Sequence, residues 1–145
     1  MKLTKLLIGF FALLILFGCS VSTEFFIQNL TTSQQIVKIK YKEKISKYLI
    51  QDFYKMQAFE YKNGIVNPKN FNKNNNAQSL EIMLVNDSTL MVELPANSTA
   101  RIAKSMNYQW KSKLENVEIQ NQKYSIKDLE KKSQKVKYDY IYQIK

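Results

Sequence analysis

Two glutamates of this sequence could lie close enough together to form a catalytic carboxylate pair. Glu81 and Glu93 stand on two runs of alternating apolar residues that a short turn joins. If Leu84 pairs with Leu90 in an antiparallel hairpin, the two carboxylates face each other about 5 Å apart, the spacing that retaining glycosidases use. Facing like charges are mildly destabilising, however, and lysines of a neighbouring strand can neutralise them. We therefore assign no catalytic residue and keep a hydrolase, using this pair or a Ser–Lys pair, as an alternative.

The composition argues against several other kinds of site. The sequence has no histidine, so it can form no histidine-based triad, and it lacks the commonest metal ligand. Gly64 is the only glycine after residue 18, which excludes a glycine-rich phosphate loop. Arg101 is the sole arginine, whereas bidentate recognition of bases and phosphates favours arginine. We predict no cofactor, no metal site and no nucleic-acid partner.

The only cysteine, Cys19, follows a segment with the layout of a secretory signal. Lys2 and Lys5 give a basic start, residues 6–17 contain no polar side chain, and small residues follow. An apolar helix of that length rises about 18 Å, against a hydrocarbon core of about 30 Å, so it is too short for a comfortable membrane span. We predict that residues 1–18 are a signal peptide.

Residues 16–19, with the sequence LFGC, resemble the lipobox of bacterial lipoproteins, in which the cysteine becomes the lipidated first residue. Phe17 departs from that pattern, because its position usually holds a small residue. The resemblance covers residues 1–19 alone and implies that acyl chains on Cys19 anchor the protein in a membrane. Ordinary signal cleavage after residues 20–22 is the alternative, because they have the small-x-small character of a soluble secretion site.

A lipid on Cys19 would hold the rest of the chain close to the bilayer. Residues 19–24 form the predicted tether, and its five residues after the cysteine reach at most about 17 Å. Removal of residues 1–18 takes away two lysines, so the formal net charge falls from +10 to +8. This charge either keeps the surface soluble or attracts anionic headgroups or an acidic envelope partner. Ser20 replaces the aspartate of an inner-membrane retention signal, which favours the outer membrane, facing the periplasm.

Residues 25–145 are predicted to form a single β-rich domain. Period-two alternation predicts strands at residues 25–30, 37–41, 80–85, 89–94, 99–104, 117–119 and 136–144, the first two joined as a hairpin. This pattern predicts a mainly β fold, a single immunoglobulin-like antiparallel β-sandwich of about seven strands with one or two helices. An α+β antiparallel sheet with helices on one face is the alternative.

Two segments have helical signals, and one has the composition of a loop. Apolar residues at helical spacing predict an amphipathic helix over residues 43–60, although its aromatic residues also favour a strand. Ser125 and Asp128 fit a capping box, which predicts a short helix that begins at Ile126. The asparagine-rich residues 63–79 are expected to form an irregular surface loop.

Three apolar residues fall on the outer face of the hairpin predicted over residues 80–94. Met83, Val85 and Met91 lie opposite its core rows, which is unusual for a face in water. We expect either the 43–60 helix or a partner to cover them, so they are candidate partner-binding residues.

Together these observations predict a membrane-anchored envelope lipoprotein that acts as a non-enzymatic binding or structural module near the bilayer. An immunity- or inhibitor-type lipoprotein that neutralises a toxin is a further alternative. Its positive charge would suit an acidic target.

Overall fold

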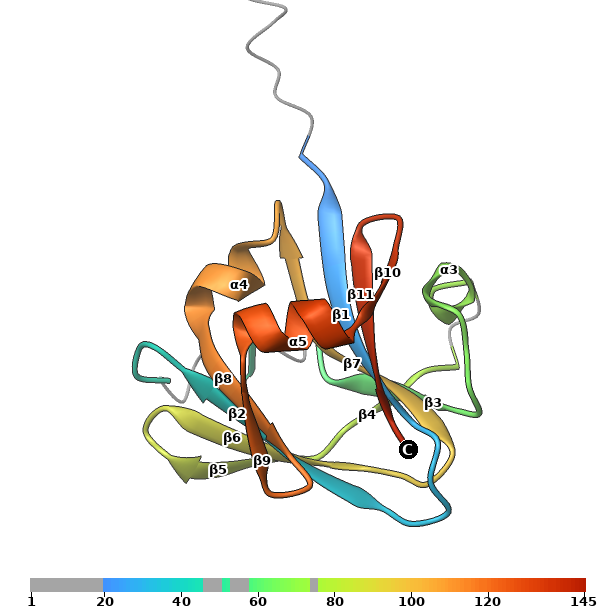
Figure 1. Ribbon diagram of the computed structural model, residues 1–145, viewed down its shortest axis with the longest axis horizontal. Helices are drawn as coiled ribbons and strands as arrows, with labels where there is room; N and C mark the ends of the chain where they lie inside the picture. Colours follow the sequence, from blue (N-terminus) through green and yellow to red (C-terminus); the bar gives the residue numbers. More distant parts are fainter. Residues whose placement is uncertain (1–19, 46–50, 53–57, 74–75) are drawn as a thin grey trace, which may run out of the picture.

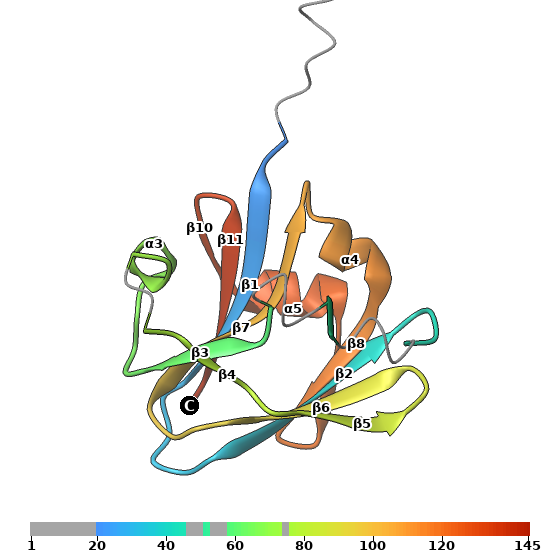
Figure 2. The same cartoon turned by 180° about the vertical axis from the view of Figure 1, so that it is seen from behind.

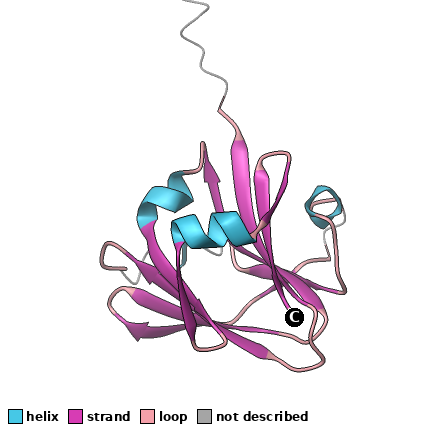
Figure 3. Ribbon diagram, viewed as in Figure 1, coloured by secondary structure: helices cyan, strands magenta, loops and turns pink. Residues whose placement is uncertain are grey.

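The computed structural model describes residues 20–45, 51–52, 58–73 and 76–145. The predicted signal peptide and Cys19 lie outside these residues. Two β-sheets and three short helices make up the described part, and all of these elements lie between Ser22 and Ile144 (Figures 1 and 3). None of these helices is long and apolar enough to cross a membrane.

The first sheet contains both ends of the described chain. Its strand order is β10 (Gln134–Val136), β11 (Asp139–Ile144), β1 (Ser22–Asn29), β7 (Ser98–Met106), β3 (Glu60–Asn63) and β4 (Gln78–Ser79). β1 runs parallel to β11 and antiparallel to β7. β1 begins at Ser22, so residues 22–24 of the predicted tether belong to the sheet.

The second sheet is antiparallel throughout. Its strand order is β5 (Ile82–Asn86), β6 (Thr89–Leu94), β2 (Gln35–Tyr41), β8 (Leu114–Ile119) and β9 (Gln122–Ser125). Alternate residues of both sheets point inward and form one main core, for example Ile27 on β1, Ile39 on β2 and Val117 on β8. This alternation follows from the period of two in a strand.

The predicted β-sandwich with a few helices is confirmed, but its strands differ from the prediction in number and in pairing. The described residues contain more strands than expected, and the β1–β11 pair is parallel. The hairpin predicted between residues 25–30 and 37–41 is wrong, because β1 and β2 belong to different sheets. The buried Asn29 fixes this corner, since its side-chain amide donates to the carbonyls of Ser33 and Pro95.

The β5–β6 hairpin has the predicted register, although Leu84, which was expected to face the core, is 40% exposed. Leu84 pairs with Leu90, and Ile82 pairs with Val92. The turn is different, because Asn86, rather than Val85, pairs with Thr89, and Val85 lies in a register irregularity. The Asn86 side chain accepts the backbone N–H of Ser88, which stabilises the tight turn.

The predicted helix at Ile126 is confirmed. α5 spans Ile126–Lys132, and the Ser125 hydroxyl accepts the backbone N–H of Asp128 at 3.2 Å. The two other helices are α3 (Pro68–Phe71), within the predicted loop, and α4 (Gln109–Lys113). Most of the helix predicted over residues 43–60 lies outside the described residues. Residues 51–52 are helical, whereas residues 43–45 and 58–60 are not.

The C-terminal segment forms a hairpin instead of the single strand predicted over residues 136–144. β10 and β11 are joined by Lys137 and Tyr138, and Lys137 adopts a φ of 60°. Tyr140 and Ile144 lie in the main core, as expected for alternate residues of β11. Tyr138 is exposed, because it stands in the turn.

Candidate functional site

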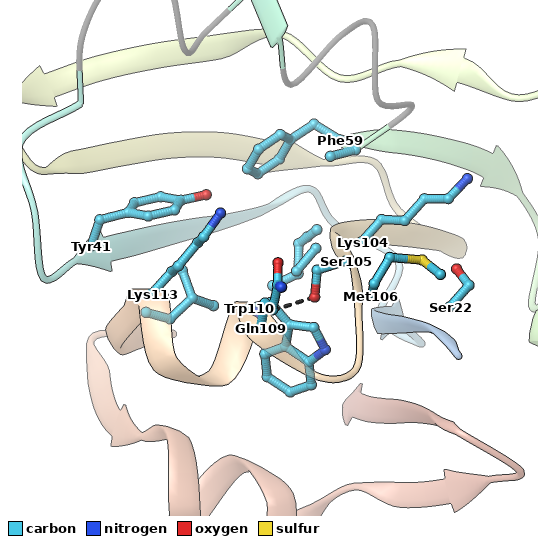
Figure 4. A pocket seen from close by; sticks show the side chains of 13 residues that line it. Ser22, Tyr41, Phe59, Lys104, Ser105, Met106, Gln109, Trp110 and Lys113 are labelled. Carbon is cyan, nitrogen blue, oxygen red and sulfur yellow. Dashed lines mark hydrogen bonds between the residues drawn. The ribbon is translucent and has the colours of Figure 1, made fainter. Parts of the chain in front are cut away.

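An apolar pocket lies between the two sheets, beside α4. Its volume is about 320 Å³, within the range of about 300–1,000 Å³ that is typical of small-molecule sites. Its walls come from β7, α4, the end of β2, the start of β8 and residues 58–59 (Figure 4). Ser22, the first residue of β1, also lines it, so the pocket reaches the end of the sandwich at which β1 begins.

A bulge in β7 gives the pocket one of its walls. Phe25 pairs with Ala103 whereas Phe26 pairs with Arg101, so Ile102 is an extra residue in β7. Strict alternation would turn Ile102 and Ala103 to opposite faces, but a bulge reorients the strand locally. Both residues belong to the main core and line the pocket, and Arg101 faces the other way.

Trp110 on α4 forms another wall. Its backbone N–H donates to the Ser105 hydroxyl at 2.9 Å, which ties α4 to the end of β7 (Figure 4). Its ring packs on Phe25, with 5.2 Å between the ring centroids. The turn before α4 uses left-handed φ angles at Asn107 and Tyr108, which reverse the chain in few residues. These contacts keep a large aromatic surface against the cavity.

Two further aromatic side chains, Tyr41 and Phe59, stand across the pocket from Trp110 (Figure 4). Burial raises the pKa of the Tyr41 phenol well above its ordinary value, which favours the neutral form of this group still further. Phe59 is fully buried and has a φ of 60°, which is uncommon for a bulky residue. The Leu80 N–H donates to the Phe59 carbonyl at 2.7 Å and helps to hold this conformation.

The rim of the pocket carries two lysines, one of which lies close to a carboxylate. Lys104 and Lys113 stand at its opposite ends (Figure 4). The Lys104 ammonium is 3.7 Å from a carboxylate oxygen of Glu24, and in the described part of the chain Lys113 has no ion pair. Apolar walls with lysines at the rim suit a molecule that has an apolar body and an anionic group. No hydrogen bond in the described structure joins a serine of the pocket to either lysine, so the geometry of a Ser–Lys nucleophile is not formed there.

The opposite face of β7 has a buried charged cluster that the sequence reasoning missed. Arg101 is fully buried, and its Nη1 donates to Glu24 at 3.1 Å and to Asn72 at 2.8 Å, while its Nη2 pairs with Glu60. The guanidinium also lies 5.2 Å from the ring centroid of Phe71 on α3. A signal for this cluster was present, because Arg101 is the sole arginine and stands inside an apolar strand.

The contacts of the Arg101 cluster hold α3 against the first sheet, although the buried Arg101 Nε has no hydrogen-bond partner in the described structure. Phe71 packs edge-on against Phe26 at 5.1 Å between ring centroids, in a second, smaller core that also contains Ile141. Figure 2 shows α3 beside the first sheet and away from the second. Because its charges are paired with one another under a helix, we interpret this cluster as structural.

The candidate partner-binding residues lie together at the edge of the second sheet. Met83 pairs directly with Met91 across β5 and β6, and β5 is the edge strand of that sheet. Met83 is 52% exposed and Val85 49% exposed, whereas Met91 is partly buried. Their role in binding a partner stays a prediction.

The two glutamates do not form an enclosed pair. The β5–β6 pairing begins at Ile82, so Glu81 lies just before the strand. Both carboxylates are exposed, and Glu93 accepts a hydrogen bond from the side chain of Gln34. An exposed pair on a sheet surface does not form the enclosed site in which a glycosidase holds its two carboxylates on either side of a sugar.

The described residues show no metal site, and the chain resembles no protein to which it was compared. Among the described residues, no group of three or more Cys, Asp or Glu side chains could hold a metal ion. No protein-family model, curated protein or solved structure matches the chain.

Proposed function

We propose that this protein is a lipoprotein of the cell envelope, anchored through acyl chains on Cys19, and that it acts as a non-enzymatic binding module beside the bilayer. Its site is the apolar pocket between the sheets, and its ligand has an apolar body and an anionic group. The observation that carries this proposal is the position of the pocket, which Ser22 lines only three residues after Cys19.

The geometry of the N-terminal residues supports a close approach to the membrane. The Val21 N–H donates to the side chain of Asn107 at 2.9 Å, and the Asn107 N–H donates to the Val21 carbonyl at 2.8 Å. The chain is therefore fixed to the domain from Val21 onward. Three extended residues span about 10 Å, so a lipid on Cys19 would place the start of β1 at the membrane surface.

Residue 20 supports a position in the outer membrane. Ser20 stands where some bacteria place an aspartate to retain a lipoprotein in the inner membrane, so we propose the outer membrane, with the domain in the periplasm.

Intact-mass measurement of the mature protein tests the anchor. We expect the mature chain to begin at Cys19 with acyl chains attached, and we expect Cys19→Ala to abolish both this processing and membrane partition. A mature chain that begins after Ser22 without lipid would contradict the proposal.

Titration with the anionic apolar dye 1-anilinonaphthalene-8-sulfonate tests the pocket. We expect Ala103→Phe, which fills the cavity, to weaken dye binding about tenfold or more, because the apolar walls are then occupied. Ala96→Phe, in the turn between β6 and β7, is the matched control. Equal dye binding by the parent and by Ala103→Phe would exclude the pocket as the site.

A second candidate function uses the exposed strip of Met83, Val85 and Met91. An edge strand with large apolar side chains is a site at which another protein can dock, as an immunity- or inhibitor-type lipoprotein requires. The net charge favours an acidic target. Crosslinking in cells should then recover one specific acidic protein with the parent and lose it with Met83→Lys, while Ile65→Lys, at a similarly exposed side chain outside the second sheet, retains it.

A further inference from the structure

The end of the sandwich at which β1 begins exposes two large apolar side chains. Met106 and Tyr138 are each 42% exposed. Met106 pairs with Ser22 on one side of β1. On the other side Phe25 pairs with Tyr140, which brings the β10–β11 turn level with the start of β1 (Figure 1). The two apolar side chains therefore flank the point at which the N-terminal residues join the domain.

Two lysines stand beside these apolar side chains. The Lys137 ammonium lies 5.3 Å from the ring centroid of Tyr138, and the Lys135 ammonium lies 6.0 Å from that of Tyr108, two residues after Met106. In the described residues neither lysine has an ion pair with a carboxylate. We call the surface formed by Met106, Lys135, Lys137 and Tyr138 the end face.

The acidic groups nearest the end face already have partners. Asp139 accepts the Glu24 N–H at 2.9 Å, and the Glu24 carboxylate pairs with Arg101 and approaches Lys104. The Asp139 carboxylate keeps its charge and acts on Lys137, but no described carboxylate forms an ion pair with either lysine, so both ammonium groups remain open to lipid phosphates. Exposed apolar side chains with unneutralised lysines are typical of proteins that rest on an anionic lipid surface.

We propose that the end face docks onto the headgroup region of an anionic phospholipid bilayer. Tyr138 and Met106 enter the interface, where an amphipathic phenol ring is well accommodated, and Lys135 and Lys137 contact the lipid phosphates. The proposal rests on the proposed acylation of Cys19 for its orientation, because the acyl chains and the end face then meet the same membrane. Docking would direct the end of the pocket lined by Ser22 towards that membrane.

Cosedimentation with lipid vesicles tests the end face without the acyl chains. The protein is the chain 19–145 carrying Cys19→Ser, which keeps every described strand and helix. We expect it to bind vesicles of phosphatidylcholine mixed with phosphatidylglycerol, and to bind phosphatidylcholine vesicles much more weakly. Because each lysine close to an anionic surface contributes about a fivefold change in affinity, Lys135→Gln with Lys137→Gln should weaken binding about tenfold or more. Met106→Ser with Tyr138→Ser should also weaken it.

The matched control carries equivalent changes away from the end face. Its apolar substitutions, Leu30→Ser and Ile36→Ser, change side chains that are similarly exposed, and Lys123→Gln and Lys145→Gln remove the same charge. We expect this variant to bind as the parent does. Absence of binding by the parent, or an equal loss in the control, would overturn the docking proposal.

Fluorescence gives a second readout that does not depend on loss of binding. The chain has one tryptophan, Trp110, which is buried, so Tyr138→Trp introduces a single exposed indole. We expect its emission to shift to shorter wavelength on phosphatidylglycerol vesicles and to be quenched by brominated lipid, whereas Ile36→Trp should show neither change. An unchanged emission from the variant at position 138 would overturn the proposal.

These results are independent of the fate of Cys19. Vesicle binding by the unacylated chain together with an unlipidated mature protein would support the end face and contradict the proposed anchor. If the mature protein is acylated but the unacylated chain does not bind anionic vesicles, the anchor is supported and the end face is contradicted.

Discussion

The two faces of β7 differ in character, because one carries a buried charged cluster and the other borders an apolar cavity. On the outer face Arg101 is fully buried, and its charge is met by Glu24 and Glu60 under the helix α3. On the inner face, Ile102 and Ala103 border an apolar cavity. The outer cluster uses paired charges to close the fold, whereas the inner face leaves space that no described side chain fills. A buried charge is thus the structural feature here, and the apolar pocket is the candidate for binding.

The bulge in β7 places the charged residue on one face of the strand and the two apolar residues after it on the other. A regular strand would alternate its residues between the two faces, and Arg101, Ile102 and Ala103 would then point out, in and out. The register shift opposite Phe25 and Phe26 turns two consecutive residues inward after a single outward one. The pocket therefore depends on one extra residue in the strand.

The largest expected effect comes from breaking the outer cluster. Arg101→Met leaves Glu24 and Glu60 without their buried partner, so we expect the free energy of unfolding to fall by about 3–5 kcal/mol. Urea denaturation measures this change. Adding Glu24→Gln and Glu60→Gln to the same chain should restore part of the loss. If the free energy of unfolding of Arg101→Met alone lies within about 1 kcal/mol of that of the parent, the cluster is not structural.

The inner face can be tested by a pair of matched enlargements. Ala100 is in the closed core and Ala103 borders the pocket. Ala100→Leu should lower the free energy of unfolding by about 1–3 kcal/mol through overpacking, and Ala103→Leu should cost clearly less, because its side chain can enter open space. Equal costs in urea denaturation would contradict the presence of a cavity beside Ala103.

An exposed ion pair sharpens the contrast with Arg101. Lys38 and Glu118 lie 2.8 Å apart across β2 and β8, with side chains 39% and 32% exposed. Water can solvate either group when its partner is lost, so Lys38→Met should change the free energy of unfolding by only about 0–1 kcal/mol. If this variant is as unstable as Arg101→Met, burial is not what separates the two ion pairs.

The smallest effect concerns Asp139, at the margin of the Arg101 cluster. Burial and the Glu24 carboxylate raise its pKa, although the Glu24 N–H, Lys137 and Arg101 act to lower it. A raised pKa in the folded state means that the folded protein binds this proton more tightly. The contribution of Asp139 to stability is therefore greatest below its ordinary pKa of 3.8, and it is lost as the pH rises through the raised value.

Asp139→Asn stays neutral at every pH and keeps a carbonyl oxygen that can accept the Glu24 N–H. We expect it to raise the free energy of unfolding near neutral pH by less than about 1 kcal/mol, because solvent screens this half-exposed group. The gain should disappear at about pH 3. Urea denaturation at both pH values measures the difference, and a gain that persists in acid would contradict the assigned cause.

Elements defined by neighbouring residues were predictable from the sequence. The Ser125 cap and the start of α5 depend on a few consecutive residues, and the pairing of Leu84 with Leu90 depends on one local hairpin. The predicted hairpin between β1 and β2 failed because its alternative partners, β7 and β11, lie more than 60 residues away along the chain. Nothing in a local pattern states which distant strand will pair.

The candidate site was predictable only in part. The exposed position of Met83 agrees with alternation, but Leu84, which alternation places in the core, is also 40% exposed, and Val85 lies in a register irregularity. The pocket gathers Tyr41, Phe59 and Trp110 from separate elements, and each of them alone reads as an ordinary core aromatic residue. Arg101 likewise acquires its role only when Glu24 and Glu60 are brought to it by two neighbouring strands.

The sequence by itself determined the period of the strands and the cap of α5, because propensity and capping depend on residues close together in the chain. Its composition also determined which kinds of catalytic or binding site the molecule can form. Only the tertiary structure decided which strands meet, which face of β7 holds charge and where the pocket lies. These features depend on contacts between distant residues, whose free energy is gained only when both sheets are assembled.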